Sequence, residues 1–148
     1  IYRRLYGVMR ELSRSPDRVN ARIWDLLWDV TSDPTPAGEA EGLHPAVRKA
    51  LEIISRELSE PLSIRTLAEE TGVSDGYLSR LFQSAFGEST LAYVRRQRLE
   101  RAAHLLQRST LPIKAVAHSV GIPDLQHFNK AIRDRYGVSP REMRAQVP

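Results

Sequence analysis

The chain has 148 residues, of which 41% are hydrophobic, and a formal net charge of +4 at pH 7. This composition is typical of a globular protein with one domain, or a compact domain with an appendage. No run of about 18 apolar residues that could span a membrane occurs. The lack of cysteine excludes disulfide frameworks and thiolate metal sites. Together with the lack of a secretory signal, it leads us to expect a cytoplasmic protein.

The positive charge is concentrated towards the C-terminus. Residues 1–42 and residues 43–73 each carry a net charge of −1, whereas residues 74–148 hold twelve basic against six acidic side chains. A basic region of this kind can bind a polyanion, but it can equally be an ordinary basic surface. Charge alone leaves both interpretations open.

The first expected elements are two amphipathic helices within residues 1–30, where apolar side chains recur at i, i+3, i+4 and i+7. Because the chain opens at Ile1 rather than Met, we expect it to be part of a longer protein. The two helices are expected to form a docking or dimerising hairpin, or the tail of a missing domain. Trp24 and Trp28 lie one helical turn apart and could anchor a dimer interface. Ordinary packing within the hairpin explains them equally well.

Residues 31–42, TSDPTPAGEAEG, are the one clear linker, because proline, glycine and acidic residues interrupt any apolar period. Everything after the linker is predicted to be helical, and no strand pattern competes. The fold expected is therefore all-α, with residues 43–148 forming the main domain. Its helices are predicted from Pro45 to about Leu58 and at about residues 64–71, 75–86, 91–107, 113–119, 124–136 and 140–146.

One stretch of about 25 residues occurs twice. SIRTLAEETGVSDGYLSRLFQSAFG begins at Ser63, and PIKAVAHSVGIPDLQHFNKAIRDRYG begins at Pro112. Small, glycine, aliphatic and aromatic positions match in the same order in both copies. Each copy fits a helix-turn-helix motif, with a glycine where the turn needs a positive φ and with Ser74 or Asp124 capping the second helix.

The second helix of each copy carries a polar stripe at i, i+3, i+4 and i+7. Its side chains can hydrogen-bond to base edges in a major groove, and neither stripe contains an acidic residue. One such stripe is explained as well by a solvated surface, but two matching stripes favour contact with DNA. The stripes are Gly76, Ser79, Arg80 and Gln83 in the first copy, and Gln126, Asn129, Lys130 and Arg133 in the second.

The helix between the two copies is predicted to have an apolar side and an arginine-rich side. A helix of about 17 residues spans roughly 25 Å, so the two reading helices are expected about 34 Å apart, one turn of duplex. We expect one or two of the arginines to bind phosphate and the others to be solvated. The apolar side is assigned to Leu91, Val94, Leu99, Ala102, Leu105 and Leu106, and the arginines are Arg95, Arg96, Arg98, Arg101 and Arg108.

From about Leu43 to Arg144 the chain resembles the C-terminal domain of the AraC/XylS family of bacterial transcription regulators. The similarity includes an Arg-Leu-x-x-Ala-x-x-Leu-Leu core in the connecting helix, from Arg98, and Gly-x-Ser-Pro after the second motif, from Gly137. It implies a seven-helix, monomeric DNA-binding domain whose two motifs read adjacent major grooves. It also implies base contacts from Gly76, Ser79 and Arg80 in the first motif, and from Leu125, Gln126, His127, Asn129 and Lys130 in the second.

The resemblance further implies an N-terminal domain, absent from this chain, that binds a small-molecule effector. Residues 1–30 resemble the last helices of that domain, which commonly dimerise. We therefore expect promoter DNA, RNA polymerase and a homodimeric partner as binding partners, and no cofactor. The second motif departs from the family pattern at Ile122, Pro123 and Ile132, so its base contacts stay open.

Nothing in the sequence indicates an enzyme or a metal site. The four histidines lack metal-ligand spacing, and no catalytic triad or glycine-rich phosphate loop occurs. Two alternatives to DNA binding are kept, namely a helical protein-interaction or dimerisation module and, more remotely, an accessory domain of an enzyme. The histidines are His44, His104, His118 and His127.

Overall fold

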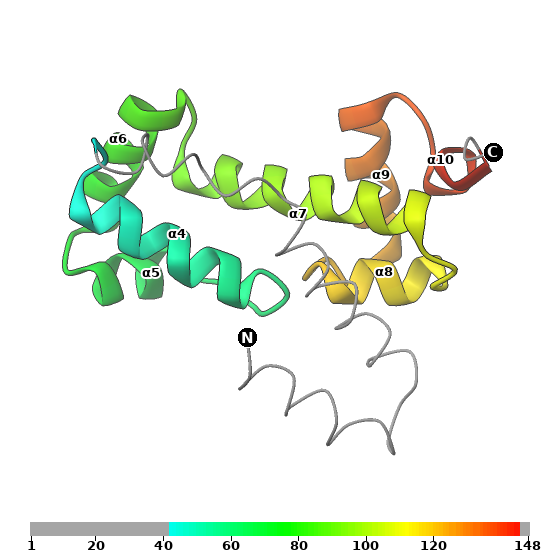
Figure 1. The fold of residues 1–148 in the computed structure, drawn as a ribbon, viewed down its shortest axis with the longest axis horizontal. Helices are drawn as coiled ribbons and strands as arrows, with labels where there is room; N and C mark the ends of the chain where they lie inside the picture. The colour runs from blue at the N-terminus through cyan, green and yellow to red at the C-terminus, as the bar shows by residue number, and fades with distance from the viewer. Residues whose placement is uncertain (1–41, 146–148) are drawn as a thin grey trace, which may run out of the picture. The chain divides into compact units, whose positions relative to one another are not determined.

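The computed structural model describes residues 42–145, whose regular elements are all helices (Figure 1). The all-α fold is confirmed, and the predicted helix bounds agree to within a residue or two. The hairpin expected at residues 1–30 and the linker up to residue 41 lie outside the described residues. Between residues 42 and 145 the helices are α4 (Pro45–Glu57), α5 (Ile64–Thr71), α6 (Asp75–Phe86), α7 (Thr90–Arg108), α8 (Ile113–Ser119), α9 (Leu125–Tyr136) and α10 (Pro140–Ala145).

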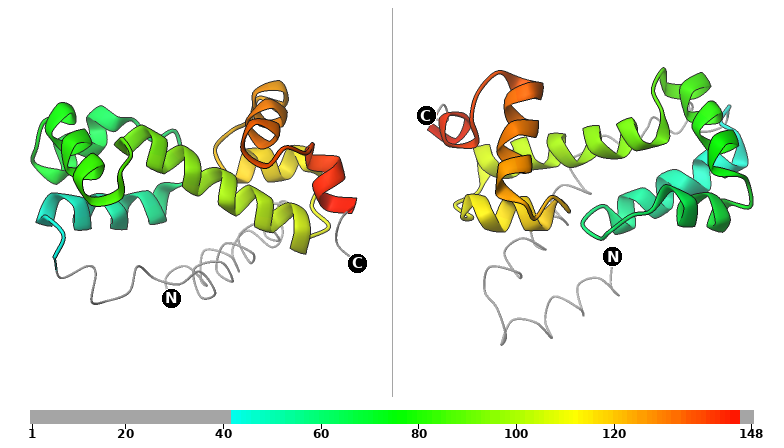
Figure 2. Two further views of the ribbon diagram at one scale, coloured as in Figure 1. Left: turned by 90° about the horizontal axis from the view of Figure 1, so that it is seen from above. Right: turned by 180° about the vertical axis from the view of Figure 1, so that it is seen from behind.

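The described residues divide into two compact units, which we call the first unit (residues 42–98) and the second unit (residues 99–145). The boundary falls within α7, which is a single unbroken helix (Figure 2). The N-terminal half of α7 therefore belongs to the first unit and its C-terminal half to the second. Each unit has its own hydrophobic core.

The first unit is built from α4, α5, α6 and the start of α7. Apolar residues of α4 recur every three or four positions, so one side of this helix is buried against the motif that follows it. Leu78 and Phe82 of α6 are completely buried in the same core. The core consists of Ala46, Val47, Ala50, Ile53, Ile54, Leu58, Leu67, Ala68, Leu78, Phe82, Tyr93 and Val94.

The second unit repeats this order of helices, with the C-terminal half of α7 in the place of α4, followed by α8, α9 and α10. Phe128 and Ile132 of α9 are completely buried, as are their counterparts Leu78 and Phe82 in α6. The core consists of Leu99, Ala102, Leu105, Leu106, Leu111, Val116, Ala117, Val120, Ile122, Phe128, Ala131, Ile132 and Met143.

The turns of the two motifs have the same backbone hydrogen bonds. In the first unit the Gly72 N–H donates to the Glu69 carbonyl and the Val73 N–H to the Ala68 carbonyl, both at 3.1 Å. The same pair of bonds recurs at Gly121 and the residue after it, at 3.1 and 3.0 Å. The two glycines have φ values of 76° and 72°. This is the Schellman end of a helix, which favours glycine because a Cβ makes positive φ costly.

The repeat extends beyond the two motifs into the helix that follows each. Gly87 and Gly137 end α6 and α9 with φ values of 71° and 75°. Two residues later the hydroxyls of Ser89 and Ser139 each accept a hydrogen bond from the N–H three residues on, both at 3.3 Å. Ser139 is also part of a capping box, since the Glu142 carboxylate accepts from the Ser139 N–H at 2.6 Å. The starts of α7 and α10 are thus structurally equivalent.

The predicted apolar side of α7 is wrong at Leu91, which is 65% exposed. Tyr93 is buried there instead, and its ring centroid lies 5.3 Å from that of Phe82 and 4.8 Å from that of Phe86. The periodicity was misleading because α7 contributes to two cores, one with each half. A helix of this kind does not need one continuous apolar stripe.

Within residues 42–145, none of the helices has both the length and the apolar character needed to cross a lipid bilayer.

Candidate nucleic-acid interface

The start of α6 is fixed by its N-cap. The Ser74 hydroxyl accepts a hydrogen bond from the Tyr77 N–H at 3.3 Å, and the Asp75 carboxylate accepts from the Gly76 N–H at 2.9 Å. Ser74 has an extended backbone with φ −74° and ψ 152°, as expected of an N-cap residue. The cap predicted from the sequence is therefore confirmed, and it defines the direction in which α6 leaves the turn.

The stripe predicted on α6 lies on its accessible side. Gly76, Arg80 and Gln83 are exposed and Ser79 is half-buried. Gly76 has open space around it, because no heavy atom beyond its neighbours lies within 4 Å of the place where a Cβ would sit. The opposite side of α6 is anchored by Phe82, whose ring centroid lies 5.3 Å from that of Tyr93 on α7. The stripe therefore stands on a helix that a packed aromatic core holds in place.

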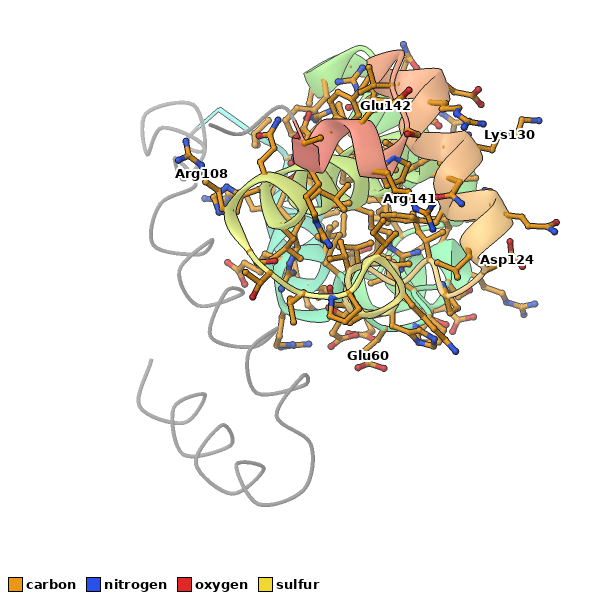
Figure 3. All side chains as sticks on the ribbon, turned by 90° about the vertical axis from the view of Figure 1, so that its right-hand side faces the viewer. Glu60, Arg108, Asp124, Lys130, Arg141 and Glu142 are labelled. Atoms are coloured by element: carbon orange, nitrogen blue, oxygen red, sulfur yellow. The ribbon has the colours of Figure 1, made fainter. Side chains whose placement is uncertain are left out.

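The start of α9 is capped in the same way as that of α6. The Asp124 carboxylate accepts a hydrogen bond from the His127 N–H at 2.6 Å. Lys130 projects from this helix away from the body of the unit (Figure 3). The sequence-predicted residues of α9 are all exposed, namely Leu125, Gln126, His127, Asn129, Lys130 and Arg133.

The departures of the second motif from the family pattern do not disturb its geometry. Ile122 and Ile132 are buried in the core of the second unit. Pro123 is exposed and precedes Asp124, which still caps α9. One feature of α9 was overlooked in the sequence. Asp134, four residues after Lys130, is exposed at the edge of the stripe and places a negative charge there.

The arginines of α7 are less available to a polyanion than the sequence suggested. Arg96 forms an ion pair with Glu88 at 2.8 Å. Arg98 donates to the carbonyls of Leu58 at 3.0 Å and Glu60 at 2.7 Å, and burial lowers the pKa of its guanidinium. Arg101 is buried, with 5% of its surface exposed.

The expectation that most of the α7 arginines are solvated is therefore wrong. Only Arg95 and Arg108 of the five are exposed. Arg96 and Arg98 are held by partners in the loops before α7 and α5, respectively, and Arg101 is buried within the second unit. Linear spacing along α7 contains no information on those neighbours.

Two functional candidates were missed in the sequence. Tyr77 lies under the Arg80 guanidinium, whose central carbon is 5.7 Å from the ring centroid. His44 caps α4, with its Nδ1 atom accepting from the Ala46 N–H at 3.1 Å, and its ring meets that of Tyr77 edge-on. The i, i+3 spacing of Tyr77 and Arg80 was a usable signal. His44 and Tyr77 are 33 positions apart, so the sequence contained no signal of their contact.

His118 is exposed on α8, and His104 is half-buried on α7. Burial, with a smaller contribution from the nearby charge of Arg108, lowers the pKa of His104. Among residues 42–145 no group of three or more histidine, aspartate or glutamate side chains is placed to hold a metal ion. The expectations of no metal and no cofactor stay predictions.

Comparison with known proteins identifies the motif. The family described as a helix-turn-helix domain matches residues 67–146, more than half of the chain. The arabinose operon regulatory protein of Escherichia coli (strain K12) is 34% identical over 110 residues, which are 71% of this chain and 38% of that protein. The chain spans little more than a third of the length of the curated relatives it matches, between 34% and 38% for three of them.

Solved structures agree with this result. A transcriptional regulator from Chromobacterium violaceum, described as containing an AraC-type DNA-binding domain, is 33% identical with a TM-score of 0.64, and the match covers 69% of this chain and 91% of that chain. The DNA-binding domain of the global transcriptional factor AdpA, solved in complex with a target DNA, is 25% identical with a TM-score of 0.65, over 69% of this chain and 92% of that chain. Two capped helix-turn-helix units in the order found here, together with these similarities, place the chain in the AraC/XylS family of helix-turn-helix transcription regulators.

Proposed function

We propose that this chain is a sequence-specific DNA-binding transcription regulator and that the exposed sides of α6 and α9 are its base-reading surfaces. The observation that carries the proposal is the repetition of one geometry. Each unit has the same Schellman turn, a capped second helix, and an accessible polar side on that helix. A helix-turn-helix motif places its second helix in the major groove, with the N-terminal residues closest to the bases.

The side chains on α6 and α9 suit base recognition. Arg80 can donate two hydrogen bonds to the O6 and N7 atoms of a guanine, and Gln83, Gln126 and Asn129 can recognise an adenine in the same way. Lys130 can reach a guanine or a phosphate. Gly76 lacks a side chain and would let the α6 backbone approach the groove closely.

Affinity for DNA that does not depend on the base sequence would come from exposed cations outside the two reading helices. Arg95 and Arg108 are the α7 arginines left for this role, and Lys114 at the start of α8 is a further exposed candidate. Each phosphate neutralised by such a side chain releases bound counterions, so binding weakens as salt increases. The separation of about 34 Å between the two reading helices stays a prediction.

The complete protein is expected to contain more than this chain, since the matched relatives are longer. We infer that residues 1–30 support a homodimer, that a further domain binds a small-molecule effector, and that the regulator contacts RNA polymerase in the cytoplasm. The inference is supported by family membership. Removing residues 1–30 is expected to abolish self-association without abolishing DNA binding, and an unchanged sedimentation mass after the truncation would contradict the first part.

The decisive experiment is selection of bound duplexes from a pool with a randomised core of about 20 base pairs, two helical turns. We expect the 148-residue chain to enrich a motif with two information-rich segments about one turn apart, with an affinity that falls steeply as salt is raised. Failure to enrich any motif would contradict sequence-specific binding. Salt-insensitive capture of a protein, with no duplex bound, would favour the interaction module instead.

A further inference from the structure

Tyr77 occupies an unusual place on α6, between the two proposed reading positions Gly76 and Ser79. Its side chain is 40% exposed, which is high for an aromatic residue of the described part of the chain. It does not contribute to the core of the first unit, whose aromatic members are Phe82 and Tyr93. Packing therefore does not explain why a large ring is placed at the accessible start of α6.

The contact with Arg80 provides a reason. The guanidinium carbon of Arg80 lies 5.7 Å from the Tyr77 ring centroid, within the distance at which a cation is attracted to an aromatic face. Among residues 42–145 Arg80 forms no hydrogen bond or ion pair, so this ring is the one group that restrains its guanidinium. The contact involves the π face of the ring and leaves the five N–H donors of the guanidinium available to a base edge.

Restraint of this kind matters because arginine loses much side-chain freedom when it binds. Immobilising a long side chain at an interface costs conformational entropy. An Arg80 that is already restrained would lose less of this freedom on contact with a base pair. It would also meet the base edge in a narrower range of directions, which sharpens discrimination.

The Tyr77 ring is itself supported from a second helix. The His44 ring meets it edge-on, with centroids 5.9 Å apart and an interplanar angle of 88°. The orientation of the imidazole is set by its own hydrogen bond, in which Nδ1 accepts from the Ala46 N–H at 3.1 Å and caps α4. The start of α4 and the start of α6 are thereby joined through two rings that end at Arg80.

The second unit lacks this arrangement. The residues of α9 that correspond to Tyr77 and Arg80 are His127 and Lys130, and in the described part of the chain no contact of Lys130 with a ring is formed. The ring and cation pair is therefore not a requirement of the helix-turn-helix fold. Of the two proposed reading helices, only α6 carries such a pair.

We propose that Tyr77, supported by His44, is a positioning residue that holds the Arg80 guanidinium for base recognition by α6. This rests on the proposed function, because it names the part that one side chain plays at the same surface. Tyr77 need not touch the base pair itself. Its effect is confined to the base pair that Arg80 reads.

The test uses the 148-residue chain and the duplex that it selects, together with single-base-pair variants of that duplex. Arg80→Ala first identifies the base pair at which preference is relaxed. At this position Tyr77→Leu is expected to reduce the discrimination between the preferred base pair and the others by about two- to five-fold, the strength of an exposed cation–π contact. Tyr77→Phe retains the ring and is expected to keep the discrimination of the wild type.

The double variant separates positioning from direct contact. In the Arg80→Ala background, Tyr77→Leu is expected to cause no further loss at this base pair. Equal weakening of all duplexes by Tyr77→Leu, in either background, would overturn the proposal and make Tyr77 a phosphate contact. Equal loss of discrimination in the Phe and Leu variants would overturn it as well.

The contribution of His44 is tested with His44→Asn, which can still cap α4 but lacks the ring. This variant is expected to unfold at the same temperature as the wild type and to lose part of the discrimination at the Arg80 base pair only. Discrimination equal to that of the wild type would overturn the role of His44.

A measurement without DNA distinguishes failure of this inference from failure of the proposed function. In the free chain the side-chain protons of Arg80 should show upfield ring-current shifts in the wild type and in Tyr77→Phe, and these shifts should be lost in Tyr77→Leu. Unshifted Arg80 protons in a wild-type chain that selects DNA would overturn the positioning role alone. A chain with shifted protons that selects no duplex would overturn the proposed function, and the recognition role of the cluster with it.

Discussion

Two glycines only four residues apart in the first unit should respond to the same substitution with opposite sign. Gly72 ends α5 with φ 76°, whereas Gly76 lies within α6 and has no positive φ. At both positions the space that a Cβ would occupy is open, with no heavy atom within 4 Å. Steric clashes with neighbours therefore cannot explain a difference between the two alanine variants, and only backbone conformation remains.

The magnitudes follow from this conformation. A left-handed backbone costs a residue with a Cβ roughly 1–2 kcal/mol, so Gly72→Ala should lower the free energy of unfolding by about that amount. An alanine in place of a helical glycine is worth roughly 0.5–1 kcal/mol, so Gly76→Ala should raise the free energy of unfolding. Gly72→Asn should lie between the wild type and Gly72→Ala, because asparagine tolerates positive φ better.

The measurement is urea unfolding followed by far-UV circular dichroism, with hydrogen exchange of the α5 and α6 amides to report the first unit separately. Gly76→Ala should also bind the selected duplex more weakly although it is the more stable protein, if the bare backbone approaches DNA there. Equal destabilisation by the two alanine substitutions would refute the reasoning from backbone conformation. A Gly76→Ala variant that binds as the wild type does would refute close approach at this residue.

Three further results are expected. In a binding titration, Arg80→Ala should weaken binding to the selected duplex by about 1–3 kcal/mol and relax the sequence preference at one base pair. Arg56→Ala removes the same charge at the C-terminal end of α4 and should have neither effect. Arg98→Ala should lower the free energy of unfolding by about 2 kcal/mol, because it removes charged hydrogen bonds to two carbonyls. Substitution of the exposed Arg95 by alanine should change the free energy of unfolding by less than about 0.5 kcal/mol. Equal effects of the two substitutions in urea titrations would contradict the internal role of Arg98. The capping hydrogen bonds hold the pKa of Glu142 below its ordinary value, so their stabilisation is complete above an unfolded-state pKa of about 4.3 and is lost as the pH falls through the folded-state pKa. Glu142→Gln should weaken the acid dependence of the melting temperature, and an unaltered dependence would argue against this cap.

The helix-turn-helix motifs could be predicted from the sequence because their determinants are local. Gly72 and Gly121 mark a turn by a property of single residues, the tolerance of positive φ. Ser74 and Asp124 mark helix starts by accepting hydrogen bonds from residues three positions on. The polar stripes follow in turn, because a helix with a known buried side leaves a known side exposed.

Only the tertiary structure decided the burial and the bonding partners of residues whose neighbours in space are distant in the chain. Leu91, Arg98 and Arg101 were all misjudged, because α7 contributes to two cores and Arg98 reaches carbonyls about 40 positions away. The cluster of His44, Tyr77 and Arg80 has the same origin, since one of its contacts joins the starts of two helices. Periodicity and caps depend on neighbours within about one turn, and so they were available from the sequence. The choice of which cation is free for DNA and which is held inside depends on neighbours that only folding brings together.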